Sequence, residues 1–184
     1  MTVAVPADQG IVLRPLTRVQ YDALVSTGKL DDEPVELLEG AMVEMPPEGP
    51  FHGGLHRRLT NYLIRRLPDD LEVSPASPFA ASALSQPEPD LAVVPVGTPH
   101  DQHPAEALLV VELSFSSLAK DLGPKARIYG QAGVPVYWVI DLRRRQVHVH
   151  TEPGPDGYGR VEVLSLETPL EVGGVTVMLA DLLD

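Results

Sequence analysis

Three side chains of this sequence have types and positions that need a chemical explanation. Glu112 interrupts ALLVVELS, an apolar run over residues 107–114 that is typical of a buried strand. A buried carboxylate is costly unless a metal ion, a basic side chain or solvent at the strand's end compensates it. Lys125 lies beside the apolar stripe of the following helical segment and can point towards the sheet. Asp90 opens another apolar strand, directly after Pro89.

Together these residues suggest a site for a divalent metal ion. If the strands of Asp90 and Glu112 are neighbours, their carboxylates can meet at one end of the sheet. Two hard oxygen ligands with open positions suit Mg²⁺ or Mn²⁺. A nearby lysine can orient or activate water, or stabilise charge on a phosphate group. A simpler alternative stays open, in which Glu112 forms a buried salt bridge with Lys125 or Lys120 and no metal is involved.

The elements that must position these residues follow from the hydrophobic pattern. Helices are expected from Thr17, over residues 52–67 and over about 121–132, the last with Pro124 in its first turn and Gly133 after its end. A hairpin is expected over 35–45, with its turn at Glu39–Gly40. Further strands are expected at 71–80, 90–95, 107–114, 136–141, 146–151, 158–165 and 172–178, followed by a short tail helix. This order predicts an α/β (α+β) fold in a single domain over residues 1–184.

Composition limits the class of protein. The chain has 184 residues, of which 43% are hydrophobic and 22% are charged, enough for a compact core. It has no cysteine, which excludes disulfides and cysteine-ligated zinc or iron–sulfur sites. No apolar run approaches the length of a membrane span, and residues 1–10 lack the pattern of a signal peptide. A cytoplasmic protein without membrane contact is therefore expected.

The formal net charge of −12 counts against nucleic-acid binding, because phosphate contacts usually need a basic surface. The charge does not exclude such binding, since a carboxylate site gains positive charge from the metal that it holds. Basic clusters at 57–58, 65–66 and 143–145 could also contact phosphates. For any one cluster, a solvated surface is the simpler interpretation.

A family resemblance rests on several motifs. Pro89–Asp90 followed by Glu112–Leu113–Ser114 resembles the PD-(D/E)XK signature of restriction-endonuclease-like nucleases. The wider chain is similar to the Uma2 family of bacterial endonucleases, also called DUF820, in VELLEGAMVEMPP, His52–Gly53, PEPDLAVV, VVELS and DLGPKARIYGQAGVPVYWVID. The resemblance implies a restriction-endonuclease-like mixed sheet flanked by helices, with a core at about 35–151. An N-terminal helix and hairpin and extra C-terminal strands would surround that core.

The resemblance also implies roles for individual residues. Ser114 stands where the signature has lysine, and Lys125 on the following helix takes that lysine's place. Glu39 is expected as an extra acidic ligand, with Glu36 as its rival, although a hairpin turn alone explains Glu39 equally well. His52 is expected to contact phosphate or metal, and a polar residue at a helix start explains it equally well.

The function expected from these observations is that of a metal-dependent endonuclease that cleaves the phosphodiester backbone of DNA. Asp90 and Glu112 would hold Mg²⁺ or Mn²⁺, with the carbonyl oxygen of Leu113 completing the metal shell as the family resemblance implies. Lys125 would position the attacking water. A homodimer is expected because paired active sites suit the cutting of two strands.

Two other functions remain open at this point. One is a non-catalytic interaction protein on the same fold, in which Glu112 and Lys125 form a structural ion pair. The other is a zinc metallohydrolase that uses His148 and His150, which lie two apart on one strand. An exposed strand face explains these two histidines more simply.

Overall fold

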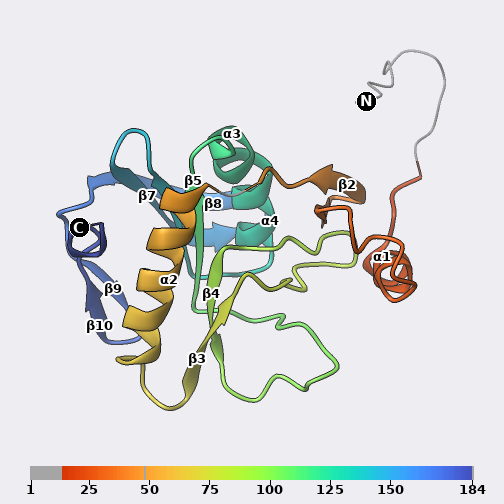
Figure 1. The fold of residues 1–184 in the computed structure, drawn as a ribbon, viewed down its shortest axis with the longest axis horizontal. Coiled ribbons are helices and arrows are strands. Elements are labelled where there is room, and N and C mark those ends of the chain that lie inside the picture. Colours follow the sequence, from red (N-terminus) through yellow and green to blue (C-terminus); the bar gives the residue numbers. More distant parts are fainter. Residues whose placement is uncertain (1–13, 48, 184) are drawn as a thin grey trace.

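A six-stranded mixed sheet forms the centre of the fold (Figure 1). The computed structural model describes residues 14–47 and 49–183, and the expectation about residues 1–10 lies outside these ranges. The sheet has the order β3-β4-β5-β6-β7-β8. Only β5 and β6 run parallel, and the other neighbours are antiparallel. The strands are β3 (Leu71–Pro75), β4 (Leu91–Pro95), β5 (Leu109–Ser114), β6 (Val136–Asp141), β7 (Gln146–Gly154) and β8 (Gly157–Ser165).

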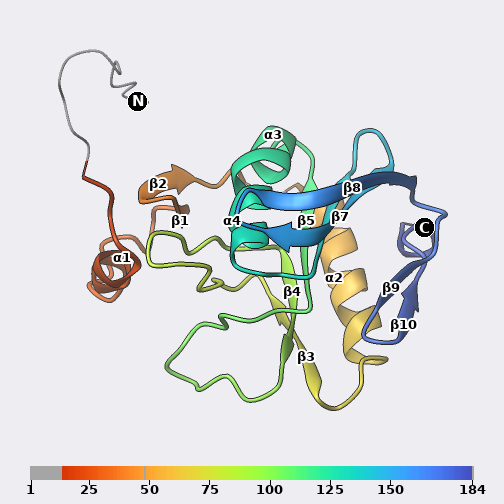
Figure 2. The same cartoon turned by 180° about the vertical axis from the view of Figure 1, so that it is seen from behind.

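Helices cover both faces of this sheet. Parallel strands need a crossover connection, and here it consists of α3 (Leu118–Lys120), the π-helical turn η1 (Asp121–Lys125) and α4 (Ala126–Gln131). Helix α2 (Pro50–Ile64) lies on the opposite face, as the two views from opposite sides show (Figures 1 and 2). The fold therefore has three layers, which confirms the predicted mixed sheet flanked by helices.

The alternation of side chains along β5 decides which layer each residue meets. Leu109, Val111 and Leu113 pack in the apolar cluster that contains the buried leucines of α2. Val110 packs in the other cluster, together with Tyr129 of α4. Glu112 has the same parity as Val110 and therefore faces the crossover helix.

The N-terminal elements are tied to the start of β4. Helix α1 (Arg18–Val25) is capped by Thr17, and the hairpin consists of β1 (Val35–Leu38) and β2 (Ala41–Glu44). Its turn has positive φ at Glu39 and Gly40, as a two-residue turn of this kind requires. Leu37 of β1 exchanges two backbone hydrogen bonds with Gln86, at 3.3 and 2.8 Å. This pairing brings the hairpin beside the segment that leads into Asp90.

The crossover helix differs from the prediction. It begins at Leu118 instead of residue 121, and Pro124 lies inside it instead of in its first turn. Proline has no N–H to donate in a helical ladder. The helix widens here into a π turn, in which the N–H of Ala126 donates to the carbonyl oxygen of Asp121. Gly133 ends the helix with a positive φ, as predicted.

Other boundaries also moved. The strand predicted at 172–178 is a hairpin of β9 (Leu170–Val172) and β10 (Val175–Val177), because Gly173 and Gly174 take positive φ and reverse the chain. Strand β3 stops at Pro75, short of the predicted 80. The short helix η2 (Ala180–Leu182) matches the predicted tail helix.

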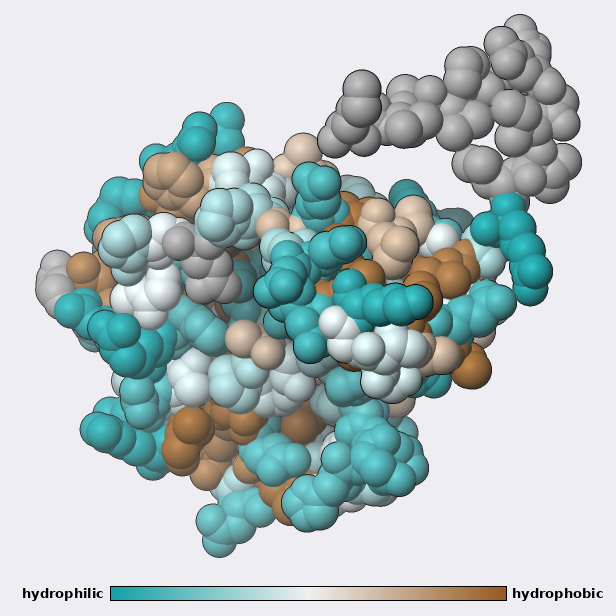
Figure 3. Space-filling view, turned by 45° about the vertical axis from the view of Figure 1, so that its right-hand side comes forward, coloured by the Kyte–Doolittle hydropathy of each residue, from teal (hydrophilic) through white to brown (hydrophobic). Residues whose placement is uncertain are grey.

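On the face shown in Figure 3, hydrophobic residues form several patches that are separated by hydrophilic ones. Within the described ranges, no helix combines the length and the apolar character that crossing a bilayer requires.

A close contact between α4 and β8 gives a test of how the crossover helix is held on the sheet. A Cβ atom at Gly130 would lie 2.5 Å from the backbone carbonyl of Gly157. Gly130→Ala should therefore lower the free energy of unfolding by about 1–3 kcal/mol, because one backbone must move away from the other. Urea denaturation measures this change. Gly54→Ala, in α2 with open space around its Cβ, should cost nothing, and an equal loss in both variants would contradict the contact.

Candidate active site

Asp90 and Glu112 lie at the same end of the sheet. In the antiparallel pair β4–β5, Leu91 is opposite Val111, and the two acids are the next residues outward on each strand. One carboxylate oxygen of Asp90 accepts a hydrogen bond from the backbone N–H of Leu113 at 2.5 Å. Both acids line a cavity of about 320 Å³. The strands are therefore neighbours, as a shared site requires.

His52 reaches the same cavity from the first turn of α2. Its Nε2 lies 3.2 Å from the second carboxylate oxygen of Asp90. One carboxylate oxygen of Asp90 is thus held by the backbone of β5, and the other is held by His52 of α2.

Lys125 supplies the positive charge that Glu112 needs. Its Nζ lies 2.8 Å from Glu112 Oε1, 3.0 Å from Glu36 Oε2 and 3.3 Å from the carbonyl oxygen of Glu88. A lysine ammonium group has three N–H donors, and these three oxygens can accept all of them. Tyr129 donates a further hydrogen bond to Glu112 Oε1 at 3.0 Å. The buried salt bridge that the sequence left open is therefore present, in the wall of the cavity that Asp90 lines.

Glu36, and not Glu39, is the hairpin acid that joins this cluster. The side chain of Glu36 is 1% exposed. It accepts from Lys120 Nζ at 2.6 Å, from Lys125 Nζ at 3.0 Å and from the N–H of Glu88 at 3.1 Å. The pairing of β1 with the segment before β4 places it there.

The expectation for Glu39 needs correction. Its carboxylate forms two hydrogen bonds with the guanidinium group of Arg127, at 2.9 and 2.7 Å, where both side chains are about half exposed. These hydrogen bonds lower the pKa of Glu39. Glu39 does not line the cavity; it ties the hairpin turn to α4 at the surface.

Ser114, the last residue of β5, anchors the crossover helix. Its hydroxyl donates to Asp121 Oδ2 at 2.5 Å, and the hydroxyl of Ser117 donates to the same oxygen at 2.6 Å. The π turn begins at Asp121, and its i→i+5 spacing brings residues five apart to the same side. Lys120 and Lys125 can therefore both reach the hairpin acid.

The cavity holds more carboxylates than ammonium groups. Glu88, Asp90, Glu112 and Asp121 line it, against two lysines. Burial raises the pKa of Glu112 well above its usual value, and Asp121 and Asp90 raise it further, although Lys125 opposes them. Burial also raises the pKa of Asp121. Burial and the neighbouring carboxylates therefore both disfavour the negative charge of Glu112.

The charge of Lys125 is itself secure. Burial lowers its pKa, but the carboxylates of Glu112, Glu36 and Asp121 outweigh burial and raise the pKa above its ordinary value. Lys125 therefore stays an ammonium ion at neutral pH.

Asp90 and Glu112 are suitable donors for a hard divalent cation. In the described ranges, no three histidine, aspartate or glutamate side chains are close enough to form a ready-made metal site. Mg²⁺ commonly takes only one or two carboxylates and keeps several waters. A carboxylate pair beside a cavity with excess negative charge fits that pattern.

Some residues of this cluster were not singled out from the sequence. Asp121 was expected only as the first helical residue, where an acid is common, and Glu88 lies between two prolines without a distinctive pattern. Both are recognised as cavity residues only once the tertiary structure places the crossover helix and the segment before β4. A Ser-x-x-x-Asp spacing in a helix start is too frequent to have marked Asp121.

His148 and His150 do not join the cluster. The ring of His150 packs against those of Tyr137 and Tyr158, with centroids 5.2 and 5.6 Å apart. Burial lowers the pKa of both histidines. The structure therefore favours a packing role for His150.

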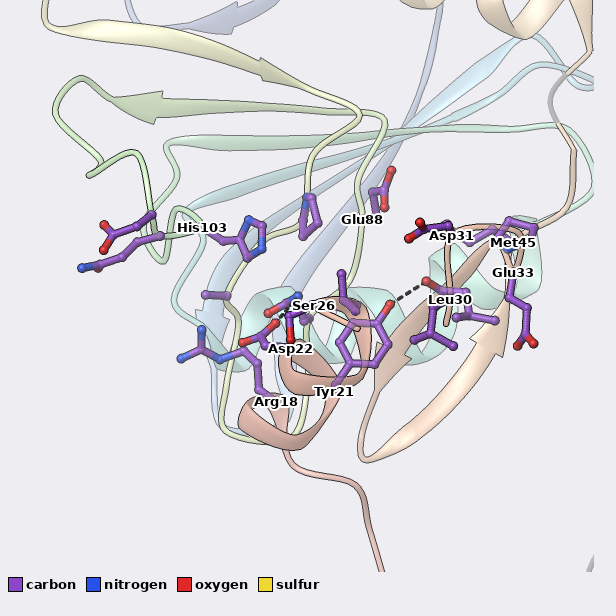
Figure 4. A pocket seen from close by; sticks show the side chains of 18 of the residues that line it. Arg18, Tyr21, Asp22, Ser26, Leu30, Asp31, Glu33, Met45, Glu88 and His103 are labelled. Atoms are coloured by element: carbon purple, nitrogen blue, oxygen red, sulfur yellow. Dashed lines mark hydrogen bonds between the residues drawn. The ribbon is translucent and has the colours of Figure 1, made fainter. Parts of the chain in front are cut away.

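A second and larger cavity, of about 750 Å³, adjoins the first (Figure 4). It lies between α1, the hairpin and the loop at 97–106, and shares Pro34, Met45 and Glu88 with the cavity of Asp90. The hydroxyl of Tyr21 at its wall donates to the carbonyl oxygen of Val35 at 2.7 Å. Acidic side chains outnumber basic ones in its lining: Asp22, Asp31, Glu33, Glu88 and Asp101 stand against Arg18 and His103. This side of the site is unfavourable for phosphate groups.

Comparisons with known proteins show the family and the fold of this chain. The family Uma2, described as "Putative restriction endonuclease", matches residues 19–179. A solved structure from Anabaena variabilis, described as "a putative nuclease belonging to DUF820", is similar with a TM-score of 0.63 and 15% sequence identity. The similarity covers 81% of this chain and 89% of the other, and it shows a common fold. No curated protein matches this sequence.

A comparison of the buried ion pair of Lys125 with the exposed ion pair of Arg127 tests the buried cluster. Lys125→Met should lower the free energy of unfolding by about 3–5 kcal/mol, because it leaves the buried carboxylate of Glu112 without a cation. Arg127→Met removes the exposed partner of Glu39 and should change it by less than about 1 kcal/mol. Guanidinium denaturation at neutral pH compares the two. Similar small effects would mean that Lys125 does not compensate the buried acids.

Proposed function

We propose that this chain, which belongs to the Uma2 family, is a metal-dependent endonuclease that hydrolyses phosphodiester bonds in DNA. One observation carries the proposal: Asp90 and Glu112 lie at the same end of the sheet and line one cavity together with Lys125. The family description and the nuclease-like fold support the class of reaction. Metal dependence, DNA as substrate and the roles of the residues are our proposals.

In the proposed reaction, Asp90 and Glu112 would hold a divalent cation, and the backbone carbonyl of Leu113 follows Glu112 directly on the same strand. Such an ion acts as a Lewis acid and makes bound water a better nucleophile at neutral pH. His52 orients Asp90 through their 3.2 Å contact, and it stands close enough to the cavity to meet a phosphate oxygen.

Lys125 has two tasks in this proposal. It keeps Glu112 in place through the 2.8 Å contact, and it presents a permanent positive charge. Its longest contact, 3.3 Å to the carbonyl oxygen of Glu88, is the one that a water or a phosphate oxygen would replace. Glu36 then holds the lysine while that contact is exchanged.

A non-catalytic interaction protein is the second candidate. It is favoured by the complete set of acceptors around Lys125, which is also what a purely structural ion pair would show. The excess of carboxylates in the cavity favours the metal-dependent enzyme instead. We further propose that the protein is cytoplasmic and forms a homodimer, an assembly whose paired active sites would suit the cutting of two strands.

Metal titration separates the two candidates. Mg²⁺ or Mn²⁺ should raise the melting temperature of the wild-type protein, because an ion that binds only the folded state stabilises it. At a hundredfold excess over its dissociation constant, the gain is about 2.7 kcal/mol. Asp90→Asn should abolish this shift. An unchanged melting temperature at millimolar metal would favour the non-catalytic protein.

Cleavage assays test the roles of individual residues. Asp90→Asn should reduce cleavage of plasmid and oligonucleotide DNA at least about 100-fold. Loss of a residue that only orients a metal ligand can already reduce activity by that factor, and loss of the ligand itself should cost no less. Glu39→Gln, at the exposed pair with Arg127, should leave the rate unchanged. The double variant His148→Gln with His150→Gln should also cleave, and loss of activity there would point to a zinc hydrolase.

A further inference from the structure

A third cavity, of about 330 Å³, opens beside the proposed cleavage site. The two cavities share Pro46, Pro47, His52, Leu113 and Ser117 as lining residues. The third cavity adds two phenylalanines, Phe51 and Phe115. A group held there would therefore lie directly next to a group in the cleavage site.

The two phenylalanine rings are exposed at this opening. Phe51 is 51% exposed and Phe115 is 53% exposed, whereas the third phenylalanine of the chain, Phe79, is 1% exposed. They are the only aromatic residues among the exposed large hydrophobic side chains of the described ranges. One exposed apolar residue needs no explanation, but two aromatic rings around one cavity are typical of a binding site.

The elements that carry the rings also carry the proposed catalytic residues. Phe51 precedes His52 in the first turn of α2, and Phe115 directly follows β5, which carries Glu112. Any ligand in contact with both rings is thus placed by the same two elements that form the cleavage site.

A positive charge lies beside one of the two rings. The guanidinium carbon of Arg143 lies 4.5 Å from the centre of the Phe115 ring. Four more arginines lie further along α2 and directly after its end, around a separate hollow of about 350 Å³ that shares no lining residue with the third cavity: Arg57, Arg58, Arg65 and Arg66. On the other side of the cleavage site, the second cavity is mostly acidic (Figure 4). A polyanion is therefore favoured on the side of the phenylalanines.

From these observations we infer that Phe51 and Phe115 stack against an unpaired nucleobase next to the cleaved phosphate, so that the preferred substrate is single-stranded DNA or a single-stranded segment of it. Aromatic rings stack on any base, while nearby arginines meet the backbone. In a duplex the bases stack on each other, and reaching the rings would require a base to leave the stack. This inference rests on the proposed function and names its substrate class.

Binding without metal tests the inference separately from cleavage. Fluorescence anisotropy in EDTA compares a labelled single strand, roughly the length that one binding site covers, with a duplex of the same sequence, using the full chain. Wild type should bind the single strand more tightly. Phe51→Ala and Phe115→Ala should each weaken single-strand binding about tenfold, the typical loss for one stacked base, and should change duplex binding less than about twofold.

Matched variants separate base stacking from a general loss of apolar surface or of stability. Ile64→Ala removes an exposed apolar side chain at the far end of α2 and should leave binding unchanged. Phe115→Leu keeps an apolar side chain but lacks the ring, so it should bind the single strand as weakly as Phe115→Ala. This variant therefore tests stacking even where Phe115→Ala lowers the stability of the protein. Phe115→Tyr keeps the ring and should bind like the wild type.

Three results would overturn the inference. The first is that the affinity for the single strand does not change when the rings are removed. The second is that removing the rings weakens binding of single strand and duplex equally. The third is that the wild type sediments as a dimer and the variant without both rings sediments as a monomer. The last result would assign the rings to contact between two copies of the chain. Ring-dependent binding without cleavage in Mg²⁺ or Mn²⁺ would instead count against the proposed enzyme and leave the stacking site in place.

Discussion

The candidate site depends on the contacts that the ammonium group of Lys125 makes with buried carboxylates. It joins Glu112 of a central strand, Glu36 of the N-terminal hairpin and the backbone of Glu88 before β4. Either carboxylate would be costly to bury alone. Lys125 contacts both, and Lys120 gives Glu36 a second cation. Three parts of the fold are therefore held together where the chemistry is proposed.

This arrangement requires the crossover helix to sit at a fixed depth above the sheet. Ser114 and Ser117 fix that depth by donating to Asp121. The π turn caused by Pro124 then directs two lysines towards one acid. Ser114 on the strand thus holds the helix from which Lys125 reaches Glu112.

The net charge of −12 gave an incomplete expectation about partners. What matters for a phosphate chain is how the charges are distributed. Acids gather around the cavity beside α1, whereas arginines gather on α2 and in the turn between β6 and β7. An acidic protein can therefore carry basic surface outside an acidic, metal-compatible site.

The sequence by itself determined the main strands, the helix α2 and the candidates Asp90, Glu112 and Lys125, because apolar periodicity and an acid within a buried run are local signals. Only the tertiary structure decided between Glu36 and Glu39. Both lie in the same hairpin, and their difference arises from the pairing of β1 with Gln86, a contact between segments far apart in the chain. The start of the crossover helix was mispredicted for a related reason. Pro124 by itself indicated a helix that begins near residue 121, whereas hydrogen bonds from Ser114 and Ser117 to Asp121 hold an earlier helical turn in place.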